Sequence, residues 1–159
     1  MEECLFCKIV AGQIPAEKVY EDSDVIAFLD INPRNPGHTL VIPKKHFSDL
    51  LEMDDEYAMK LFVAVKRIAK AIKDGIKADG ISISQSNGRA AGQVVNHMHV
   101  HVIPRFFNEG PVGLESILPT KKIDQGSMKN ISNILKEAIS KVSEVSKPAS
   151  EKKEMEFEF

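Results

Sequence analysis

Apolar residues recur along part of the chain with the period of a helix. Between residues 54 and 77 they follow one another at three- and four-residue steps. Acidic residues open this segment, where the helix macrodipole favours negative charge. The pattern predicts a long amphipathic helix whose inner positions are Leu61, Val65, Ile68, Ile72 and Ile76. A second helix near the C-terminus is predicted by Ile131, Leu135, Ala138, Ile139 and Val142.

Other segments have the length and pattern of strands. Residues 25–29 and 39–42 are short apolar runs, and residues 80–85 alternate apolar and polar side chains. A loop must lie between the first two runs, because residues 32–37 contain two prolines, two asparagines and a glycine. This loop delivers His38 to the start of the next strand. Strands in turn-linked succession with a long helix between them predict an α+β fold with an antiparallel sheet.

The length of the chain suits one compact domain. With 159 residues it can bury a sizeable core without help from disulfides. We expect a single domain over residues 1–145, followed by a polar C-terminal tail over residues 146–159. The tail should be mobile unless Phe157 and Phe159 dock on a surface.

Charge and hydropathy exclude two classes of partner. A formal net charge of −2 provides no basic field, so a nucleic acid polymer is not an expected partner. No segment approaches the apolar length that spans a bilayer, and the first residues lack the features of a secretory signal. We therefore expect a cytoplasmic protein without a membrane partner.

Both cysteines of the chain lie in one Cys-x-x-Cys segment, at Cys4 and Cys7. This spacing suits two thiolates on one metal ion better than a structural disulfide in a reducing compartment. The pair is only half a site, and histidines or carboxylates from elsewhere would have to complete it. The alternative is two reduced, half-buried cysteines.

Three histidines at alternate positions, His97, His99 and His101, are the strongest chemical signal in the sequence. In an extended strand they would line one face, while Met98, Val100 and Val102 would pack on the other. Imidazoles so close together titrate as a coupled group, and at least one should be neutral near neutral pH. A neutral imidazole can attack phosphorus. Two alternatives stay open at this point: histidines that are merely hydrogen-bonded, and a catalytic zinc held by an alternating pair.

The segment from His97 to Ile103, together with Gly37–Lys44 and Ala91–Gln93, closely resembles the histidine triad nucleotide-binding family. The likeness runs from Cys4 to about Arg105. It implies a HIT-like fold that has a five-stranded antiparallel sheet, one long central helix and a C-terminal helix, and that forms a homodimer. It also implies binding of a purine nucleotide, with hydrolysis or transfer of its nucleoside monophosphate.

The resemblance assigns catalytic roles to individual residues. His99 would be the nucleophile that forms a nucleotidyl-histidine intermediate, while His101 and His38 would hold the phosphate and help to move protons. Gln93, together with Asn87, would make polar contacts to the phosphate and to the leaving group. One departure from the family's pattern is Val94, which stands where a Ser or Thr hydroxyl often faces the phosphate.

The same resemblance suggests where the nucleoside and a metal would bind. Asp30 would accept hydrogen bonds from the ribose hydroxyls and Ile31 would lie against the base, although an Asp at a strand end is by itself more often a turn residue. Prokaryotic-type members with an N-terminal Cys-x-x-Cys bind a structural Zn²⁺, and no organic cofactor is expected. The matching ligands are Cys4, Cys7, His46 and His97.

Several functions are compatible with these residues. The first hypothesis is a hydrolase or nucleotidyl transferase that cleaves a phosphoramidate, acyl-phosphate or phosphoanhydride bond and releases AMP or GMP. The alternatives are hydrolysis of dinucleoside polyphosphates as the main reaction, a purine-nucleotide binding module without catalysis, and a zinc-dependent hydrolase. The last of these predicts that a chelator stops turnover outright.

Overall fold

The computed structural model describes residues 3–109, 118 and 120–143. The chain divides into two compact units, Met1–Gly110 and Pro111–Phe159. The first unit contains a sheet with two helices, and the second contains helix α3 (Gln125–Ser143). The predicted tail over residues 146–159, with Phe157 and Phe159, lies outside the described residues. The predicted boundary at residue 145 therefore stays a prediction.

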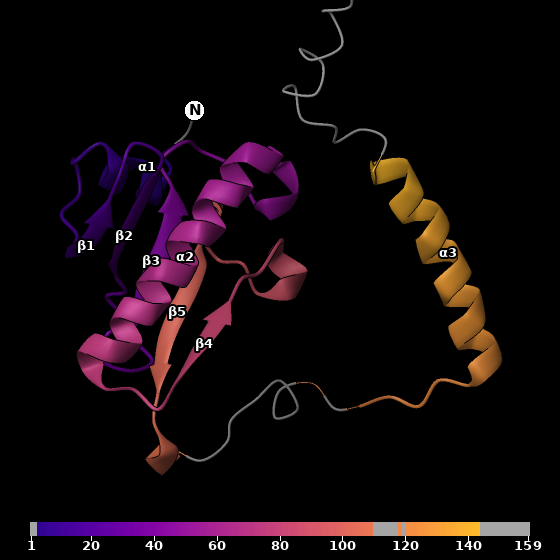
Figure 1. The fold of residues 1–159 in the computed structure, drawn as a ribbon. Coiled ribbons are helices and arrows are strands. Elements are labelled where there is room, and N and C mark those ends of the chain that lie inside the picture. Colours follow the sequence, from indigo (N-terminus) through magenta and orange to yellow (C-terminus); the bar gives the residue numbers. More distant parts are fainter. Residues whose placement is uncertain (1–2, 110–117, 119, 144–159) are drawn as a thin grey trace, which may run out of the picture. The chain divides into compact units, whose positions relative to one another are not determined.

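Five strands form one sheet in which every neighbouring pair is antiparallel (Figure 1). Across the sheet they follow the order β1-β2-β3-β5-β4. Their bounds are β1 Lys18–Glu21, β2 Val25–Leu29, β3 Thr39–Pro43, β4 Gly80–Ser84 and β5 Val100–Arg105. The α+β prediction with a five-stranded antiparallel sheet is thus confirmed.

The long predicted helix is present as α2, Asp55–Ile76. Its N-cap is Asp54, whose carboxylate accepts a hydrogen bond from the backbone N–H of Tyr57 at 2.8 Å. The helix ends at Lys77, which adopts the left-handed conformation with φ 58°. Leu61, Val65 and Ile68 are buried and Ile72 is half-buried, as the helical period predicts. Ile76 was predicted to be an inner position but is 39% exposed, because it lies in the last turn of the helix.

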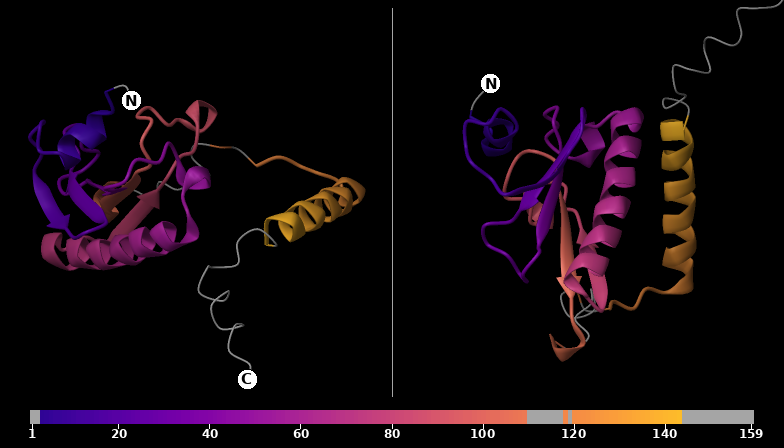
Figure 2. Two further views of the ribbon diagram at one scale, coloured as in Figure 1. Left: turned by 90° about the horizontal axis from the view of Figure 1, so that it is seen from above. Right: turned by 60° about the vertical axis from the view of Figure 1, so that its left-hand side comes forward.

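Alternation along the central strands gives the sheet two apolar faces. One face packs on α2 and the other on the short helix α1 (Leu5–Val10), and Figure 2 shows the two helices on opposite sides of the sheet. In the β3–β5 register, Leu40 lies opposite His101, and Leu40 belongs to the cluster that α1 covers. His101 therefore lies on the α1 side. The strand residues on the α2 side are Val25, Ala27, Val41, Val100 and Val102.

The loop before β3 depends on a glycine. Gly37 has φ +92°, and a Cβ atom at this position would collide with Cδ1 of Ile76 on α2. The loop closes through a hydrogen bond of 3.0 Å from the N–H of His38 to the carbonyl oxygen of Asn35. This tight return sets His38 at the start of β3, as the sequence predicted.

Helix α3 confirms the predicted C-terminal helix. Before its first turn, the carboxylate of Asp124 accepts the N–H of Ser127 at 2.9 Å. No helix within residues 3–109 and 120–143 is both long and apolar enough to cross a membrane. Along α3, large apolar side chains are exposed at Met128, Ile131, Ile134, Leu135 and Ile139.

Candidate active site and metal cluster

Strand pairing brings three histidines together on the α1 side of the sheet. His38 precedes β3 and His101 lies on the neighbouring β5, and the Nε2 atom of His38 is 2.9 Å from Nδ1 of His101. The ring of His99 lies next to that of His101, with their centroids 5.1 Å apart. His38 is 3% exposed, so its ring is shielded from solvent. The structure therefore unites His38, His99 and His101.

Hydrogen bonds set the proton positions on His38 and His101. The backbone N–H of Arg34 donates to Nδ1 of His38 at 3.0 Å, so this nitrogen must be the acceptor. In the neutral ring the proton then lies on Nε2, which donates to Nδ1 of His101. The proton of a neutral His101 must consequently lie on its own Nε2.

Burial favours the neutral form of both rings. The pKa of His101 is lowered to about 4, chiefly by burial and then by the neighbouring His99 and His38, with Asp30 opposing. Burial likewise lowers the pKa of His38, again against the attraction of Asp30. Near neutral pH the pair therefore presents one N–H donor without a net charge.

His99 is held in the opposite tautomer. Its Nδ1 lies 2.7 Å from the backbone carbonyl oxygen of His97, and a carbonyl oxygen can only accept, so Nδ1 carries the proton. The Nε2 atom of a neutral His99 then carries the lone pair. A nitrogen lone pair beside a half-buried N–H donor is an arrangement that suits nucleophilic attack on phosphorus.

His97 and His99 precede the strand that carries His101, although both rings contact Phe6 on the α1 side. The prediction of one extended strand through His97, His99 and His101 is therefore wrong in its extent, because β5 begins at Val100 and His97 lies in a bend. The bend turns the His97 ring toward the N-terminal cysteines. Met98, Val100 and Val102 do pack on the opposite, α2 side, as predicted.

The predicted nucleoside-binding residues lie in the loop after β2. A carboxylate oxygen of Asp30 is 3.5 Å from Nε2 of His38, and the other accepts the N–H of Asn32 at 2.8 Å. Ile31 is 89% exposed and contributes an apolar surface next to this carboxylate. Asp30 therefore stabilises the turn after β2 and also lies beside His38.

Asn87 and Gln93 are tied into the loops around them. The Gln93 amide accepts from the N–H of Gly88 at 2.7 Å and donates to the carbonyl oxygens of Ser48 and Val95 at 2.6 and 3.0 Å. The Asn87 carbonyl accepts the N–H of Leu50 at 2.9 Å, and its amide group donates to Gln85. Both side chains therefore hold loop backbone in place. Val94, by contrast, is 93% exposed.

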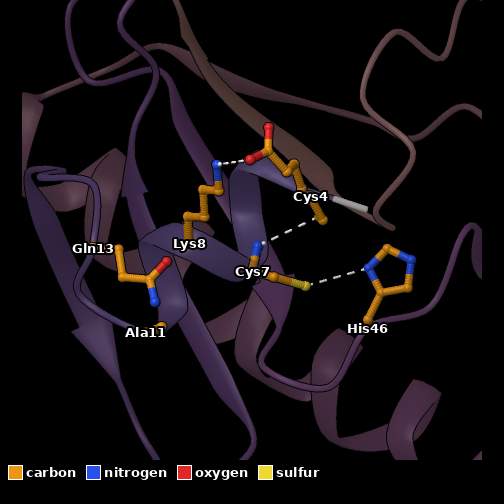
Figure 3. A pocket seen from close by; sticks show the side chains of 7 residues that line it. Cys4, Cys7, Lys8, Ala11, Gln13 and His46 are labelled. Carbon is orange, nitrogen blue, oxygen red and sulfur yellow. Dashed lines mark hydrogen bonds and ion pairs between the residues drawn. The ribbon is translucent and has the colours of Figure 1, made fainter. Parts of the chain in front are cut away.

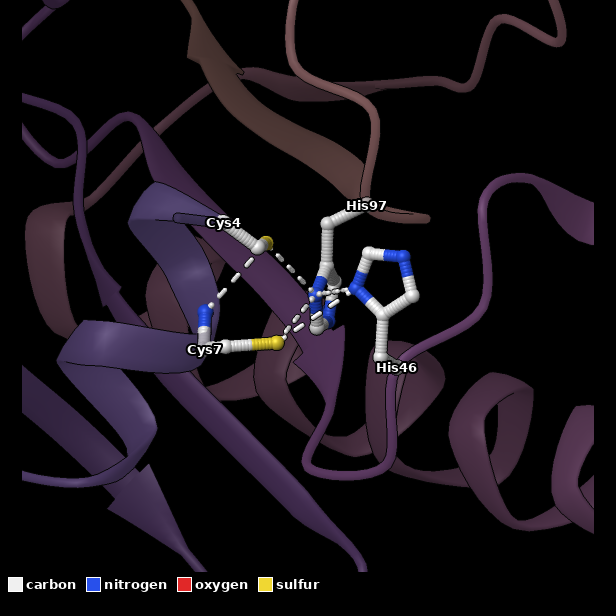
Figure 4. Close-up of side chains that lie close together, drawn as sticks. All are labelled: Cys4, Cys7, His46 and His97. Atoms are coloured by element: carbon white, nitrogen blue, oxygen red, sulfur yellow. Dashed lines mark hydrogen bonds between the residues drawn. The ribbon is translucent and has the colours of Figure 1, made fainter. Parts of the chain in front are cut away.

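The four residues predicted as metal ligands form a compact cluster (Figure 4). The Nδ1 atom of His97 lies 3.3 Å from the sulfur of Cys4, 3.5 Å from that of Cys7 and 3.1 Å from Nδ1 of His46. The sulfur of Cys7 is 3.4 Å from Nδ1 of His46. All four ligand atoms lie within 4.8 Å of one another.

This donor set fits a tetrahedral metal ion. Bonds of about 2.3 Å to sulfur and about 2.0–2.1 Å to nitrogen imply ligand atoms roughly 3.3–3.8 Å apart, close to the observed separations. His97 donates from Nε2 to the carbonyl oxygen of Pro43 at 2.9 Å, which leaves the Nδ1 lone pair toward the cluster. Burial and the neighbouring Cys4 raise the pKa of the Cys7 thiol to about 11, so only a cation would favour its thiolate.

A pocket opens beside the cluster (Figure 3). Cys4, Cys7 and His46 lie on its wall, and an ion pair of 3.5 Å between Lys8 and Glu3 lies at its edge. The cluster is therefore accessible from solvent on one side.

A family model of the HIT domain matches residues 11–108. The chain belongs to the HIT family. The matched residues include His38, His99 and His101, whereas both cysteines precede them. The resemblance inferred from the histidine motif is thereby confirmed.

Relatives of this HIT-family chain occur in archaea, bacteria and fungi. A HIT-like protein of Methanocaldococcus jannaschii is 52% identical over 109 residues, which cover 69% of this chain and 84% of the relative. The adenosine 5'-monophosphoramidase of Candida albicans is 36% identical over 143 residues, covering 87% and 93%. A crystal structure of a protein from Streptococcus mutans superposes with a TM-score of 0.80 at 44% identity, covering 87% of each chain.

One residue of this HIT-family site was not predicted from the sequence. Phe6 lies between the two cysteines, is 4% exposed, and places its ring 5.3 Å from that of His99. Its apolar character and its place inside the Cys-x-x-Cys segment were the only signals, and neither indicates a contact with a histidine some 90 residues away.

Proposed function

We propose that this protein hydrolyses a purine nucleoside phosphoramidate through a covalent nucleotidyl intermediate on His99, releasing AMP or GMP. The observation that carries the proposal is the hydrogen bond of 2.7 Å from Nδ1 of His99 to the carbonyl oxygen of His97, which directs the Nε2 lone pair away from the backbone. The His38–His101 pair beside it supplies an N–H donor for a phosphate oxygen. Acyl phosphates and phosphoanhydrides of the same nucleotides would react in the same way.

In the first step, Nε2 of His99 attacks the α-phosphorus and the bond from phosphorus to the leaving nitrogen breaks. The leaving group departs as a neutral amine after taking one proton from solvent. Positive charge then develops on the His99 ring, and the carbonyl oxygen of His97 stabilises it through the Nδ1–H hydrogen bond.

In the second step, water attacks the same phosphorus and the bond to Nε2 breaks. The proton released by water balances the one taken up in the first step, and His99 returns to its neutral tautomer. Splitting the transfer in two replaces one difficult displacement by two easier ones.

The surrounding residues bind and orient the substrate in this proposal. His101 donates from Nε2 to a phosphate oxygen, and His38 holds His101 in the tautomer that makes this possible. Asp30 accepts the ribose hydroxyls and Ile31 covers the base. Direct contacts of Asn87 and Gln93 with the substrate stay a prediction, while their hydrogen bonds support a role in fixing the loop that leads to His97.

The relatives support the choice of reaction. The adenosine 5'-monophosphoramidase of Candida albicans, which this chain matches over 93% of its length, carries that activity in its name. A similar enzyme of Schizosaccharomyces pombe is 42% identical over 111 residues. A phosphoramidate is therefore the first substrate to test.

The experiment is AMP release from adenosine phosphoramidate and from a dinucleoside tetraphosphate, with wild type, His99→Ala and chelator-treated protein. We expect turnover of the phosphoramidate in wild type and chelator-treated protein, and none in His99→Ala. Trapping of radiolabelled AMP on wild type only would support the covalent intermediate. Turnover by His99→Ala would refute it, complete loss of turnover on chelation would favour a metal hydrolase, and a tight AMP complex without turnover would favour a binding module.

We also propose that Cys4, Cys7, His46 and His97 bind a structural Zn²⁺. Four protein ligands would close the coordination sphere, so the ion would stabilise the fold and supply no reacting water. Metal analysis of the purified protein should give about one zinc per chain. Cys7→Ser should lower this content strongly, whereas Ser23→Ala, a distant surface change, should not.

Homodimerisation is part of the proposal as well. The edge strand β4 carries Ile83, which is 52% exposed, and Met59 and Val63 on α2 are 62% and 48% exposed in the single chain. Such apolar exposure is compatible with a contact to a second copy. Sedimentation equilibrium should report the mass of two chains, and a monomer over the whole concentration range would contradict this part.

A further inference from the structure

Helix α1 begins inside the metal-ligand segment. Cys4 is its N-cap, and the sulfur of Cys4 accepts the N–H of Cys7 at 3.4 Å. Phe6 therefore lies on the same helical turn that connects the two thiols. A helix of six residues is too short to be stable by itself, so its position depends on what its side chains contact.

The Phe6 ring packs edge-on against both functional clusters. Its centroid lies 5.8 Å from the ring of His97 and 5.3 Å from that of His99, with interplanar angles of 73° and 86°. A third edge contact of 5.5 Å to Phe28 fixes the ring on the sheet. One buried ring thus separates a candidate metal ligand from the candidate nucleophile.

The orientation of His99 depends on few contacts. The carbonyl oxygen of His97 holds Nδ1 on one side, while Phe6 and His101 contact the ring. If the Phe6 ring moved, His99 could rotate about its Cβ–Cγ bond and break the hydrogen bond from Nδ1. The lone pair would then no longer lie on Nε2 in every molecule, and the fraction of reactive tautomer would fall.

We propose that Phe6 is a positioning residue that couples the Cys4, Cys7, His46 and His97 cluster to the tautomer of His99. Zinc in the cluster would fix the α1 turn, the turn would fix Phe6, and Phe6 would hold His99 with Nε2 toward the substrate. This inference rests on the proposed function of His99. It differs from that function in making the nucleophile responsive to a metal that does not touch the substrate.

The pocket beside the cluster makes such coupling adjustable. Cys4, Cys7 and His46 line a pocket, so a metal ion would reach the cluster from this side (Figure 3). In the proposed coupling, a change of metal occupancy would alter the orientation of the His99 ring.

The test compares Phe6→Leu with Ile9→Ala in the zinc-loaded protein. Leu keeps an apolar side chain at residue 6 but removes the ring edge, and Ile9, 6% exposed, belongs to the same helix and apolar cluster as Phe6. The readouts are zinc content, kcat and KM for adenosine phosphoramidate, and the nitrogen chemical shifts of the isotopically labelled His99 ring, which report its tautomer.

We expect Phe6→Leu to keep its zinc, to bring the two ring-nitrogen shifts of His99 closer together, and to lower kcat about tenfold or more with a smaller change in KM. Zinc-free wild type should show the same spectral change, and Ile9→Ala should show none. Unchanged His99 shifts in either Phe6→Leu or zinc-free protein would overturn the coupling. Because the shifts are measured without substrate, failure of the coupling is distinguishable from absence of phosphoramidase activity.

Discussion

Acidification should destabilise the protein through His101. Burial lowers the pKa of this ring from 6.5 to about 4 in the folded protein, whereas the unfolded chain keeps the ordinary value. Between these two values the unfolded chain binds a proton that the folded protein does not. The contribution of His101 to stability is therefore complete above about pH 6.5 and is lost as the pH falls toward about 4.

The size of this effect follows from the two pKa values. A difference between 6.5 and about 4 corresponds to about 3 kcal/mol of unfolding free energy, at roughly 1.4 kcal/mol for each pH unit. Between about pH 7 and about pH 4.5 the loss should be about 2 kcal/mol. The groups that face the ring are His99, His38, Asp30 and Arg34, and only the Asp30 carboxylate opposes the shift.

Urea unfolding of wild type and His101→Asn at about pH 7 and about pH 4.5 measures this contribution. Asn cannot titrate, so the free energy of unfolding of the variant should fall by about 2 kcal/mol less than that of wild type over the same interval. Titrating groups away from the ring are common to both proteins and largely cancel, whereas His38 and His99 contact it, so any change in their own titration is part of the measured difference. Parallel losses in the two proteins would refute the reasoning.

Three further predictions concern the loops around the site. Gly37→Ala should lower the free energy of unfolding, measured with urea, by about 1–3 kcal/mol, because its backbone has φ +92° and the added Cβ would collide with Cδ1 of Ile76. Adding Ile76→Val, which removes that Cδ1 atom, should recover part of the loss. Gln93→Met should lower the free energy of unfolding by about 1–3 kcal/mol in the same assay, because it leaves the N–H of Gly88 and the carbonyl oxygens of Ser48 and Val95 without their hydrogen-bond partner. A loss near zero would contradict this. Val94→Ser should leave stability within about 0.5 kcal/mol, because this side chain is 93% exposed. Its kcat/KM for adenosine phosphoramidate should rise up to about tenfold, and an unchanged value would mean that the hydroxyl does not reach the phosphate.

The periodic elements were predictable from local pattern because their apolar positions contact a single surface. The helix expected over residues 54–77 is α2, Asp55–Ile76, and the runs 25–29 and 39–42 are β2 and β3. Strand β1 and helix α1 were not predicted. The four side chains of β1 are mostly exposed, and the six residues of α1 are too few to display a helical period.

The candidate site was predictable only where local spacing determines it. Alternation correctly indicated that His99 and His101 lie close together, since these residues are adjacent along one face. The place of His97 could not be derived this way, because it depends on a bend and on Cys4, 93 residues away in the chain. The hydrogen-bond partners of Gln93 could not be predicted from the sequence either, because they are backbone groups of three separate residues.

Fixed hydrogen-bond partners explain why four histidines close together can have different roles. Each uses one nitrogen on a fixed partner: His97 on the carbonyl of Pro43, His99 on the carbonyl of His97, His38 on the N–H of Arg34, and His101 on His38. In the proposed function, the remaining nitrogen of His97 would face the metal, that of His99 the phosphorus and that of His101 a phosphate oxygen, while that of His38 contacts His101. His97 differs from the others because its ring lies in the cluster of candidate metal ligands while its carbonyl oxygen accepts from His99. Substitution of His97 keeps the carbonyl but removes a metal ligand together with the bond to Pro43 and the contact with Phe6. Cys7→Ser removes a metal ligand and leaves the His97 ring in place, so the cysteine variant is the cleaner test of what the metal contributes to catalysis.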